Sequence, residues 1–172
     1  DYESIKNNYG ALLIPSIDGV SVSDVQAIAS NLKKLMTEDG VGIVASSGLF
    51  SYDENGQYAE NQSAPLMDLI FKIKPKIYLD GVPANITIQA PPVDAPLHPI
   101  LGMYNESGNI VDYTKLYFTE FEASPNTSVD VLAKIVSDNI EYNGVIAGNR
   151  GGGKFVHFSS LDVMMDTRMT WA

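Results

Sequence analysis

Residues 126–158, NTSVDVLAKIVSDNIEYNGVIAGNRGGGKFVHF, carry the pattern that decides the predicted fold. Apolar residues recur at helical spacing over residues 128–140, and Asn143-Gly144 supplies the left-handed backbone with which helices often end. A short apolar strand, a glycine-rich turn and a second strand that ends at Phe158 follow. The stretch therefore predicts an amphipathic helix followed by a hairpin.

The same order occurs once before, over residues 23–52. Ser23 and Gln26 have the spacing of a capping box, and an apolar stripe at helical spacing follows them. The chain is thus predicted to contain two helix-plus-hairpin units, 23–52 and 126–158. An old duplication and chance similarity both explain two copies.

Composition limits the classes of function. With 172 residues the chain has the size of one domain, and the absence of cysteine excludes disulfides, thiolate catalysis and cysteine-ligated zinc. The 11 basic and 21 acidic residues give a net charge of −10, which disfavours binding to nucleic acid or to an anionic membrane. No apolar run approaches the ~20 residues of a membrane-spanning helix. We therefore expect no nucleic-acid partner and no membrane insertion.

Turn signals divide the remainder of the chain. Residues 1–20 are predicted to form an N-terminal arm or edge strand, ahead of a single domain over residues 21–172. Asn-Gly at 55–56 lies between tyrosine-bearing arms and predicts a hairpin, and Asp-Gly at 80–81 is predicted to join two further strands. Together these elements predict an α+β fold, in which a mixed or mainly antiparallel sheet with several hairpins packs against two amphipathic helices.

The glycine turn fits the spacing of a phosphate-binding loop, G-x-x-x-x-G-K, from Gly148 to Lys154. The match lacks the hydroxyl residue that should follow the lysine, because Phe155 stands there, and the next residues alternate as in a strand instead of opening a helix. We interpret the turn as a hairpin tip that is flexible or faces a ligand, with Arg150 and Lys154 as contact residues.

Three lysines, Lys72, Lys74 and Lys76, form a basic stripe on one face of a predicted strand. The stripe fits a seat for phosphate, an acidic sugar or an acidic partner surface. It also fits an edge strand that lysines and Pro75 protect from aggregation, and we favour this second interpretation.

Two sets of side chains suggest a hydrolytic site. Glu120 and Glu122 share one face of a long predicted strand, about 7 Å apart, which is a separation found between the carboxylates of inverting glycosidases. His157 and Asp162 form the second set. Two glutamates at a strand end are more often part of a solvated edge, so we expect no catalytic residue, no metal site and no cofactor.

Three functions remain. The favoured one is a non-catalytic structural or interaction subunit of a larger assembly, such as a phage particle or surface appendage; it predicts protein partners, a homo-oligomer and a virion or cell-surface location over a cytoplasmic one. The alternative is a carbohydrate-binding or adhesin module that binds a glycan through tyrosines at hairpin tips. These tyrosines are Tyr52, Tyr58, Tyr104 and Tyr113. The third function is a small hydrolase with paired carboxylates.

Overall fold

The computed structural model describes residues 1–89 and 110–166. Within these ranges the chain forms four helices and one mixed sheet of seven strands, so the predicted α+β class is confirmed. The helices are α1 (Tyr2–Asn8), α2 (Val22–Thr37), α3 (Glu60–Phe71) and α4 (Leu161–Met165). The strands are β1 (Ala11–Ile14), β2 (Gly42–Ser46), β3 (Ile73–Ile88), β4 (Ile110–Ala123), β5 (Asp130–Ser137), β6 (Ile140–Arg150) and β7 (Gly153–Phe158). None of the described helices is long and apolar enough to cross a membrane.

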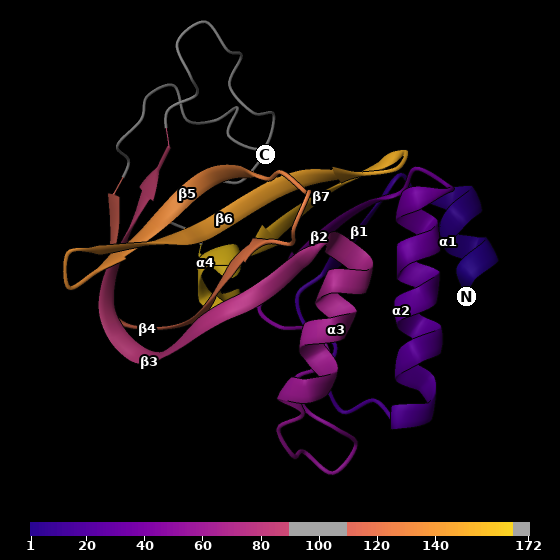
Figure 1. Ribbon diagram of the computed structural model, residues 1–172, viewed down its shortest axis with the longest axis horizontal. Coiled ribbons are helices and arrows are strands. Elements are labelled where there is room, and N and C mark those ends of the chain that lie inside the picture. Colours follow the sequence, from indigo (N-terminus) through magenta and orange to yellow (C-terminus); the bar gives the residue numbers. More distant parts are fainter. Residues whose placement is uncertain (90–109, 167–172) are drawn as a thin grey trace, which may run out of the picture.

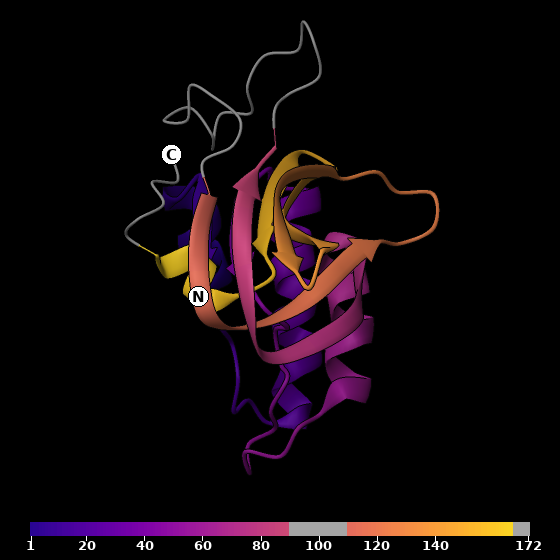
Figure 2. The ribbon, with the colours of Figure 1, turned by 90° about the vertical axis from the view of Figure 1, so that its left-hand side faces the viewer.

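The sheet combines a parallel part with an antiparallel part, in the order β1-β2-β7-β6-β5-β3-β4. β1, β2 and β7 run parallel, whereas every pair from β7 through to β4 is antiparallel. β1 is connected to β2 through α2, because parallel neighbours need a crossover connection. α2 and α3 lie side by side in both ribbon views and pack on the parallel part of the sheet (Figure 1, Figure 2).

The first predicted helix is confirmed as α2. Its apolar stripe is buried in a cluster that also holds residues of α3 and β2. The buried residues of the stripe are Val25, Ala29, Leu32, Leu35 and Met36. The N-cap is Ser21 instead of Ser23, and the Ser21 hydroxyl donates to the Asp24 carboxylate at 2.7 Å.

The second predicted helix is wrong, because residues 130–137 form β5. Asp138 and Asn139 both adopt left-handed backbone, with φ of 52° and 64°, and turn the chain directly into β6 as a two-residue hairpin. Several residues of this stretch are β-branched, which favours the pleated surface of a sheet. The predicted unit over residues 126–158 therefore has strands and no helix.

The predicted hairpin at Asp80-Gly81 is also wrong. β3 continues through these residues, and its pairing with β4 shifts register between Leu79 and Val82. Gly81, with φ of 62°, absorbs the extra residues as a bulge in the strand. The helix α3, which sequence analysis missed, occupies residues just before this strand.

The other two predicted hairpins are confirmed. Tyr52 and Tyr58 form an antiparallel bridge around the 55–56 turn, and β6 and β7 meet at the glycine turn. The glycine tip lies against the end of α2, where the Gly152 N–H donates to the Thr37 carbonyl at 3.3 Å. Strands on both sides of this turn leave no helix N-terminus for a phosphate, so the geometry of a phosphate-binding loop is absent there.

Candidate ligand-binding site

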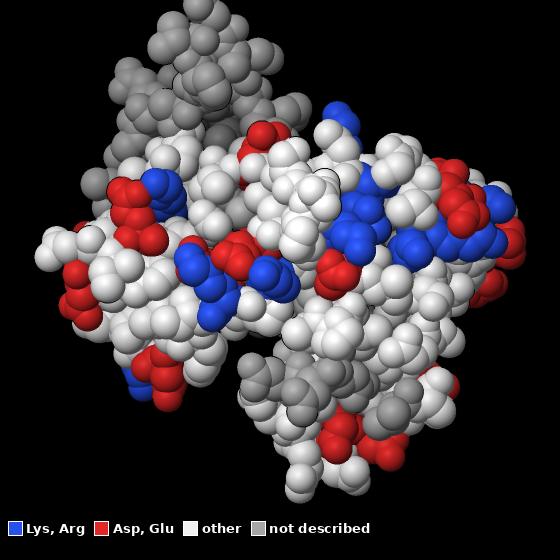
Figure 3. All heavy atoms as spheres, viewed as in Figure 1, with Lys and Arg blue, Asp and Glu red and all other residues white. Residues whose placement is uncertain are grey.

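A cleft of about 570 Å³ opens where the three parallel strands end. In sheets with parallel strands, ligands commonly bind outside the carboxyl ends of the strands. Residues after β1, β2 and β7 form one side of the cleft, and β3 and β4 form the other. The lining residues, here called the tyrosine cleft, are Pro15, Ser16, Asp18, Ser47, Gly48, Ser51, Tyr52, Tyr58, Tyr78, Tyr117, Phe118, Thr119 and Leu161. The surface is hollowed between the β3–β4 ribbon and α3 (Figure 3).

Four exposed tyrosines from three parts of the chain converge on this cleft. Tyr52 and Tyr58 belong to the 55–56 hairpin, and their ring centroids lie 5.7 Å apart at 59°. Tyr78 comes from β3 and Tyr117 from β4. The four side chains are 48%, 63%, 58% and 40% exposed, in chain order. Large aromatic groups with a hydroxyl at one end suit ligands that present both apolar and polar faces.

The tyrosine hydroxyls influence one another. Desolvation, followed by the negative charge of Asp80 and by the neighbouring tyrosines of the cleft, raises the pKa of Tyr78 above its ordinary value. A hydrogen bond with Tyr117 raises the pKa of Lys115, whose ammonium lies 5.0 Å from the centre of the Tyr117 ring. The phenol of Tyr78 therefore stays protonated at neutral pH and can donate a hydrogen bond.

Asp18 fixes the hairpin that carries Tyr52. Its carboxylate accepts the N–H groups of Ser51 at 2.9 Å and Tyr52 at 3.1 Å, and it also accepts the Ser16 hydroxyl at 2.6 Å. The Gly19 N–H donates to the Tyr52 carbonyl at 3.1 Å. The segment after β1 thus ties down the segment after β2, which holds one wall of the cleft in place.

Ser47 forms part of the floor in a strained backbone conformation. Its φ of 52° is unusual for a residue with a side chain, and such conformations persist where surrounding contacts impose them. The Ser47 N–H donates to the Phe158 carbonyl at 2.8 Å, and Nε2 of His157 donates to the Ser47 carbonyl at 2.7 Å. Both contacts come from β7, which therefore holds the floor of the cleft from beneath.

His157 and Asp162 do not form an acid–base pair. His157 is fully buried, with its ring 4.4 Å from that of Phe121, and burial lowers its pKa to about 4. Its Nδ1 has no hydrogen-bond partner in the part of the chain that the structure describes. Asp162 is exposed in the first turn of α4. His157 therefore positions the backbone of Ser47 and does not face the cleft.

Glu120 and Glu122 are already paired with lysines. The buried Glu120 lies 3.2 Å from the Lys76 ammonium and accepts the Asn143 N–H at 3.2 Å, while Glu122 lies 3.2 Å from Lys74. Neither glutamate lines the cleft. These two carboxylates form part of a row of ion pairs across β3 and β4 and leave no room for a catalytic water between them.

The same ion pairs account for the basic stripe. Lys74 and Lys76 are matched by the glutamates of β4, and Lys72 is 3.3 Å from Asp68. On the face shown in Figure 3, basic side chains lie beside acidic ones. Residues 73–82 have β4 on one side and no strand on the other, since β3 meets β5 only from Asn85 to Ile88. This part of β3 has the free edge that we predicted.

The remaining predicted contact residues lie apart from the cleft. Arg150 donates to the carbonyls of Leu69 and Ile70, which end α3, and Lys154 is exposed at the start of β7. The Tyr113 hydroxyl donates to the Asp166 carboxylate, away from the cleft. Tyr104, like the proline-rich connection around it, lies outside the described residues.

Of the four predicted tyrosines, the structure therefore brings together only Tyr52 and Tyr58. Sequence analysis missed Tyr78 and Tyr117 as site residues. Their exposed positions in the alternating pattern of β3 and β4 were a weak signal, which becomes informative only once those strands are known to face the hairpin.

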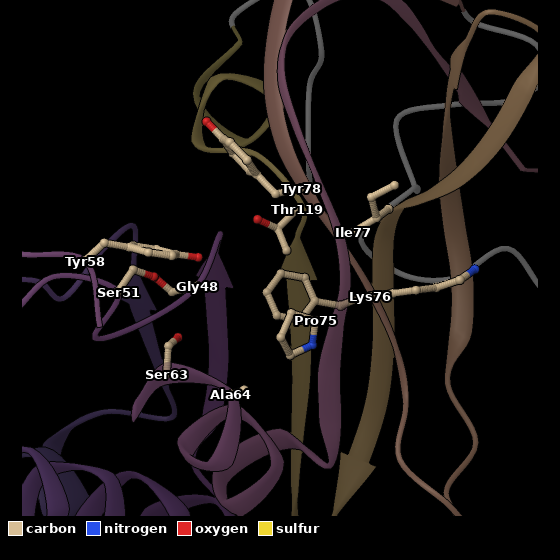
Figure 4. Close-up of a pocket in the computed structure, with 11 residues that line it drawn as sticks. Gly48, Ser51, Tyr58, Ser63, Ala64, Pro75, Lys76, Ile77, Tyr78 and Thr119 are labelled. Atoms are coloured by element: carbon tan, nitrogen blue, oxygen red, sulfur yellow. The ribbon is translucent and has the colours of Figure 1, made fainter. Parts of the chain in front are cut away.

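A second, smaller cavity continues from the cleft. It has a volume of about 170 Å³ and shares Gly48, Ser51, Tyr58, Tyr78 and Thr119 with the tyrosine cleft. The residues that line it, here called the narrow chamber, further include Ser63, Ala64, Pro75, Lys76, Ile77 and Phe121. In Figure 4, Ser51 and Ser63 lie opposite Pro75 and Thr119, and the side chains of Lys76 and Ile77 point away from the space between them.

Metal-ligand clusters are not found in the described ranges, where no three His, Asp or Glu side chains are grouped to hold an ion. The lining of the cleft is instead made of hydroxyl groups, aromatic rings and backbone. Such a surface binds its ligand through hydrogen bonds and ring contacts.

No protein-family model and no curated protein sequence matches the chain. Its fold is similar to that of a GH42 β-galactosidase from G. stearothermophilus, with a TM-score of 0.63 and 12% identity over 92% of this chain and 20% of that one. A β-galactosidase from Bacillus circulans sp. alkalophilus gives a TM-score of 0.59 and 12% identity over 90% and 20% of the two chains. A cytoplasmic protein from Salmonella typhimurium LT2 gives 0.52 and 15% over 92% and 63%. The chain spans about a fifth of the length of these β-galactosidases.

These comparisons correct two predictions. The non-catalytic structural or interaction subunit and the expectation that the chain is not an enzyme are both contradicted, because the similar folds with the two higher TM-scores occur in glycoside hydrolases. No particle or appendage protein is among the three structures described above. At 12–15% identity the likeness shows a shared fold.

Proposed function

We propose that this chain is a domain of a carbohydrate-active enzyme and that the tyrosine cleft binds a saccharide. The observation that carries the proposal is the convergence of four exposed tyrosines on one cleft at the carboxyl ends of the parallel strands. The occurrence of the fold in β-galactosidases supports it. Substrate binding is the part of the reaction that we assign to this cleft.

The chemistry of the cleft matches a sugar in two respects. A pyranose presents a face of C–H groups, which packs on an aromatic ring, and a rim of hydroxyls, which need hydrogen-bond partners. Tyr52 and Tyr58 offer tilted rings, while Ser16, Ser51 and Thr119 contribute hydroxyls. A volume of about 570 Å³ falls within the ~300–1,000 Å³ typical of small-molecule sites.

Isothermal titration with β-galactosides tests the proposal. A sugar that covers roughly 60 Å² of the Tyr58 ring, at about 25 cal/mol per Å², contributes about 1.5 kcal/mol. Tyr58→Ala is therefore expected to weaken binding about tenfold. Tyr9→Ala is the matched control, since Tyr9 is 59% exposed, against 63% for Tyr58, and lies outside the cleft.

Lactose and galactose serve as the first probes, and two-dimensional NMR locates the binding surface. Binding should shift the amide signals of residues around Ser47, Tyr52, Tyr78 and Tyr117. The proposal is overturned if no saccharide binds, or if Tyr9→Ala weakens binding as much as Tyr58→Ala does.

The predicted protein partners, the homo-oligomer and the virion or cell-surface location stay predictions. The glycan partner is the one that the tyrosine cleft favours, because its lining suits a sugar and carries no broad surface of one charge.

A further inference from the structure

We infer that the cleft selects an uncharged saccharide of at least two units, with the terminal unit in the narrow chamber and the next unit against the tyrosines. This inference rests on the proposed function, which it extends from saccharides in general to a length and a charge class. Three features of the described residues carry it: the continuity of the two cavities, the absence of an available charge, and the position of Gly48.

The two cavities are continuous and differ in character. They share five residues, so a ligand in one reaches the other without crossing a wall. The wide part is bounded by Tyr52 and Tyr117, which the narrow chamber lacks, whereas Ser63, Ala64 and Pro75 bound only the narrow chamber. One part thus offers ring contacts and the other a tight fit.

The volumes set the length of the ligand. At ~30 Å³ per water molecule, the narrow chamber of about 170 Å³ holds about six waters, which leaves room for one sugar ring and not for two. The wide part is about three times as large. A single ring fills only one of the two spaces, so a ligand of two or more units gains contacts that a monosaccharide cannot make.

The charged groups at the walls are engaged elsewhere. Lys76 directs its side chain away from the narrow chamber and pairs with Glu120 at 3.2 Å (Figure 4). In the wide part, Asp18 accepts hydrogen bonds from Ser16, Ser51 and Tyr52. A sulfated or uronic-acid ligand would therefore lose water without gaining an ion pair from the described lining residues, which disfavours it against a neutral sugar.

Gly48 keeps the junction between the two parts open. It lines both cavities, and a Cβ added there would lie 2.5 Å from the Ser51 hydroxyl and 3.1 Å from the Ser63 hydroxyl. Its φ lies outside the left-handed region, so alanine fits its backbone. Gly48→Ala should therefore narrow the junction without straining the chain.

Calorimetric titration with galactose, lactose, a neutral galactotriose and a digalacturonate tests the inference. The wild-type protein should bind lactose at least about tenfold more tightly than galactose, and digalacturonate at least about tenfold more weakly than lactose. Gly48→Ala should bring lactose down to the level of galactose and leave galactose within about twofold. Gly10→Ala is the control, since a Cβ at Gly10 meets nothing within 4 Å.

Ala64→Leu provides a second route to the same result, because it fills the narrow chamber from α3 if Gly48→Ala does not fold. Equal affinity for galactose and lactose overturns the inference, as does an equal loss for both sugars in Gly48→Ala, or digalacturonate binding as tight as lactose binding. In each of these outcomes saccharides still bind, so the proposed function survives. Absence of binding by every saccharide overturns both.

Discussion

Replacement of His157 by phenylalanine is expected to remove a pH dependence from the stability of this fold. His157 is fully buried between Phe71 and Phe121, with ring centroids 6.0 and 4.4 Å away, and donates to the Ser47 carbonyl beneath the cleft. Burial lowers the pKa of His157 to about 4, so its ring is neutral at pH 7. In the unfolded chain the pKa returns to about 6.5.

The direction of the effect follows from proton binding. Between pH 6.5 and about 4 the unfolded chain binds a proton at this ring and the folded chain does not, so acidification favours the unfolded state. The stability is therefore complete above pH 6.5 and decreases as the pH falls toward 4. A difference between 6.5 and about 4, at about 1.4 kcal/mol per pKa unit, amounts to about 3 kcal/mol.

Urea unfolding followed by circular dichroism measures this difference at pH values between about 7 and 4. His157→Phe keeps an aromatic ring in the site and loses the titrating group, so its free energy of unfolding should decrease less on acidification, by about 3 kcal/mol, than that of the wild type. His98→Gln accounts for the other histidine of the chain. The same pH dependence in wild type and His157→Phe would refute the reasoning.

Two further changes test the packing around the sheet, both by urea unfolding. Gly151→Ala should destabilise the fold by about 2–4 kcal/mol, because its φ is +59° and the added carbon would overlap the carbonyl at the end of α2; Gly56→Ala, with φ +73° in open space, should cost about 1–2 kcal/mol. Lys76→Met should cost about 1–3 kcal/mol, since it removes the ion-pair partner of the buried Glu120, whereas Lys74→Met, whose partner is 40% exposed, should cost less than about 1 kcal/mol. Equal costs within either pair would contradict these assignments.

The fold was predictable where neighbouring residues specify both ends of an element. α2 combines a regular apolar stripe with a polar first turn, and the 55–56 hairpin has the asparagine and glycine that its turn requires. β5 was mistaken for a helix because its pairing with β6 is irregular between Val131 and Lys134. The irregularity lets adjacent residues Leu132 and Ala133 both face the core, which imitates helical spacing.

The candidate site was far less predictable, since it depends on contacts between distant segments. The two tyrosines of one hairpin were found because they flank a recognisable turn. Tyr78 and Tyr117 become site residues only through the pairing of β3 with β4 and the placement of that pair opposite the hairpin. The row of lysines and glutamates had the opposite fate, because cross-strand pairing neutralises side chains that look available in the sequence.

The wall of the cleft that carries Tyr78 and Tyr117 is joined to the larger part of the sheet over a short length. β3 meets β5 only from Asn85 to Ile88, so the ribbon beyond it is a two-stranded extension (Figure 1). Substitutions at exposed positions of this extension alter its tilt while the layer of α2 and α3 stays intact. Ligand preference and thermodynamic robustness are therefore encoded in separate segments, and natural selection can modify the first without eroding the second.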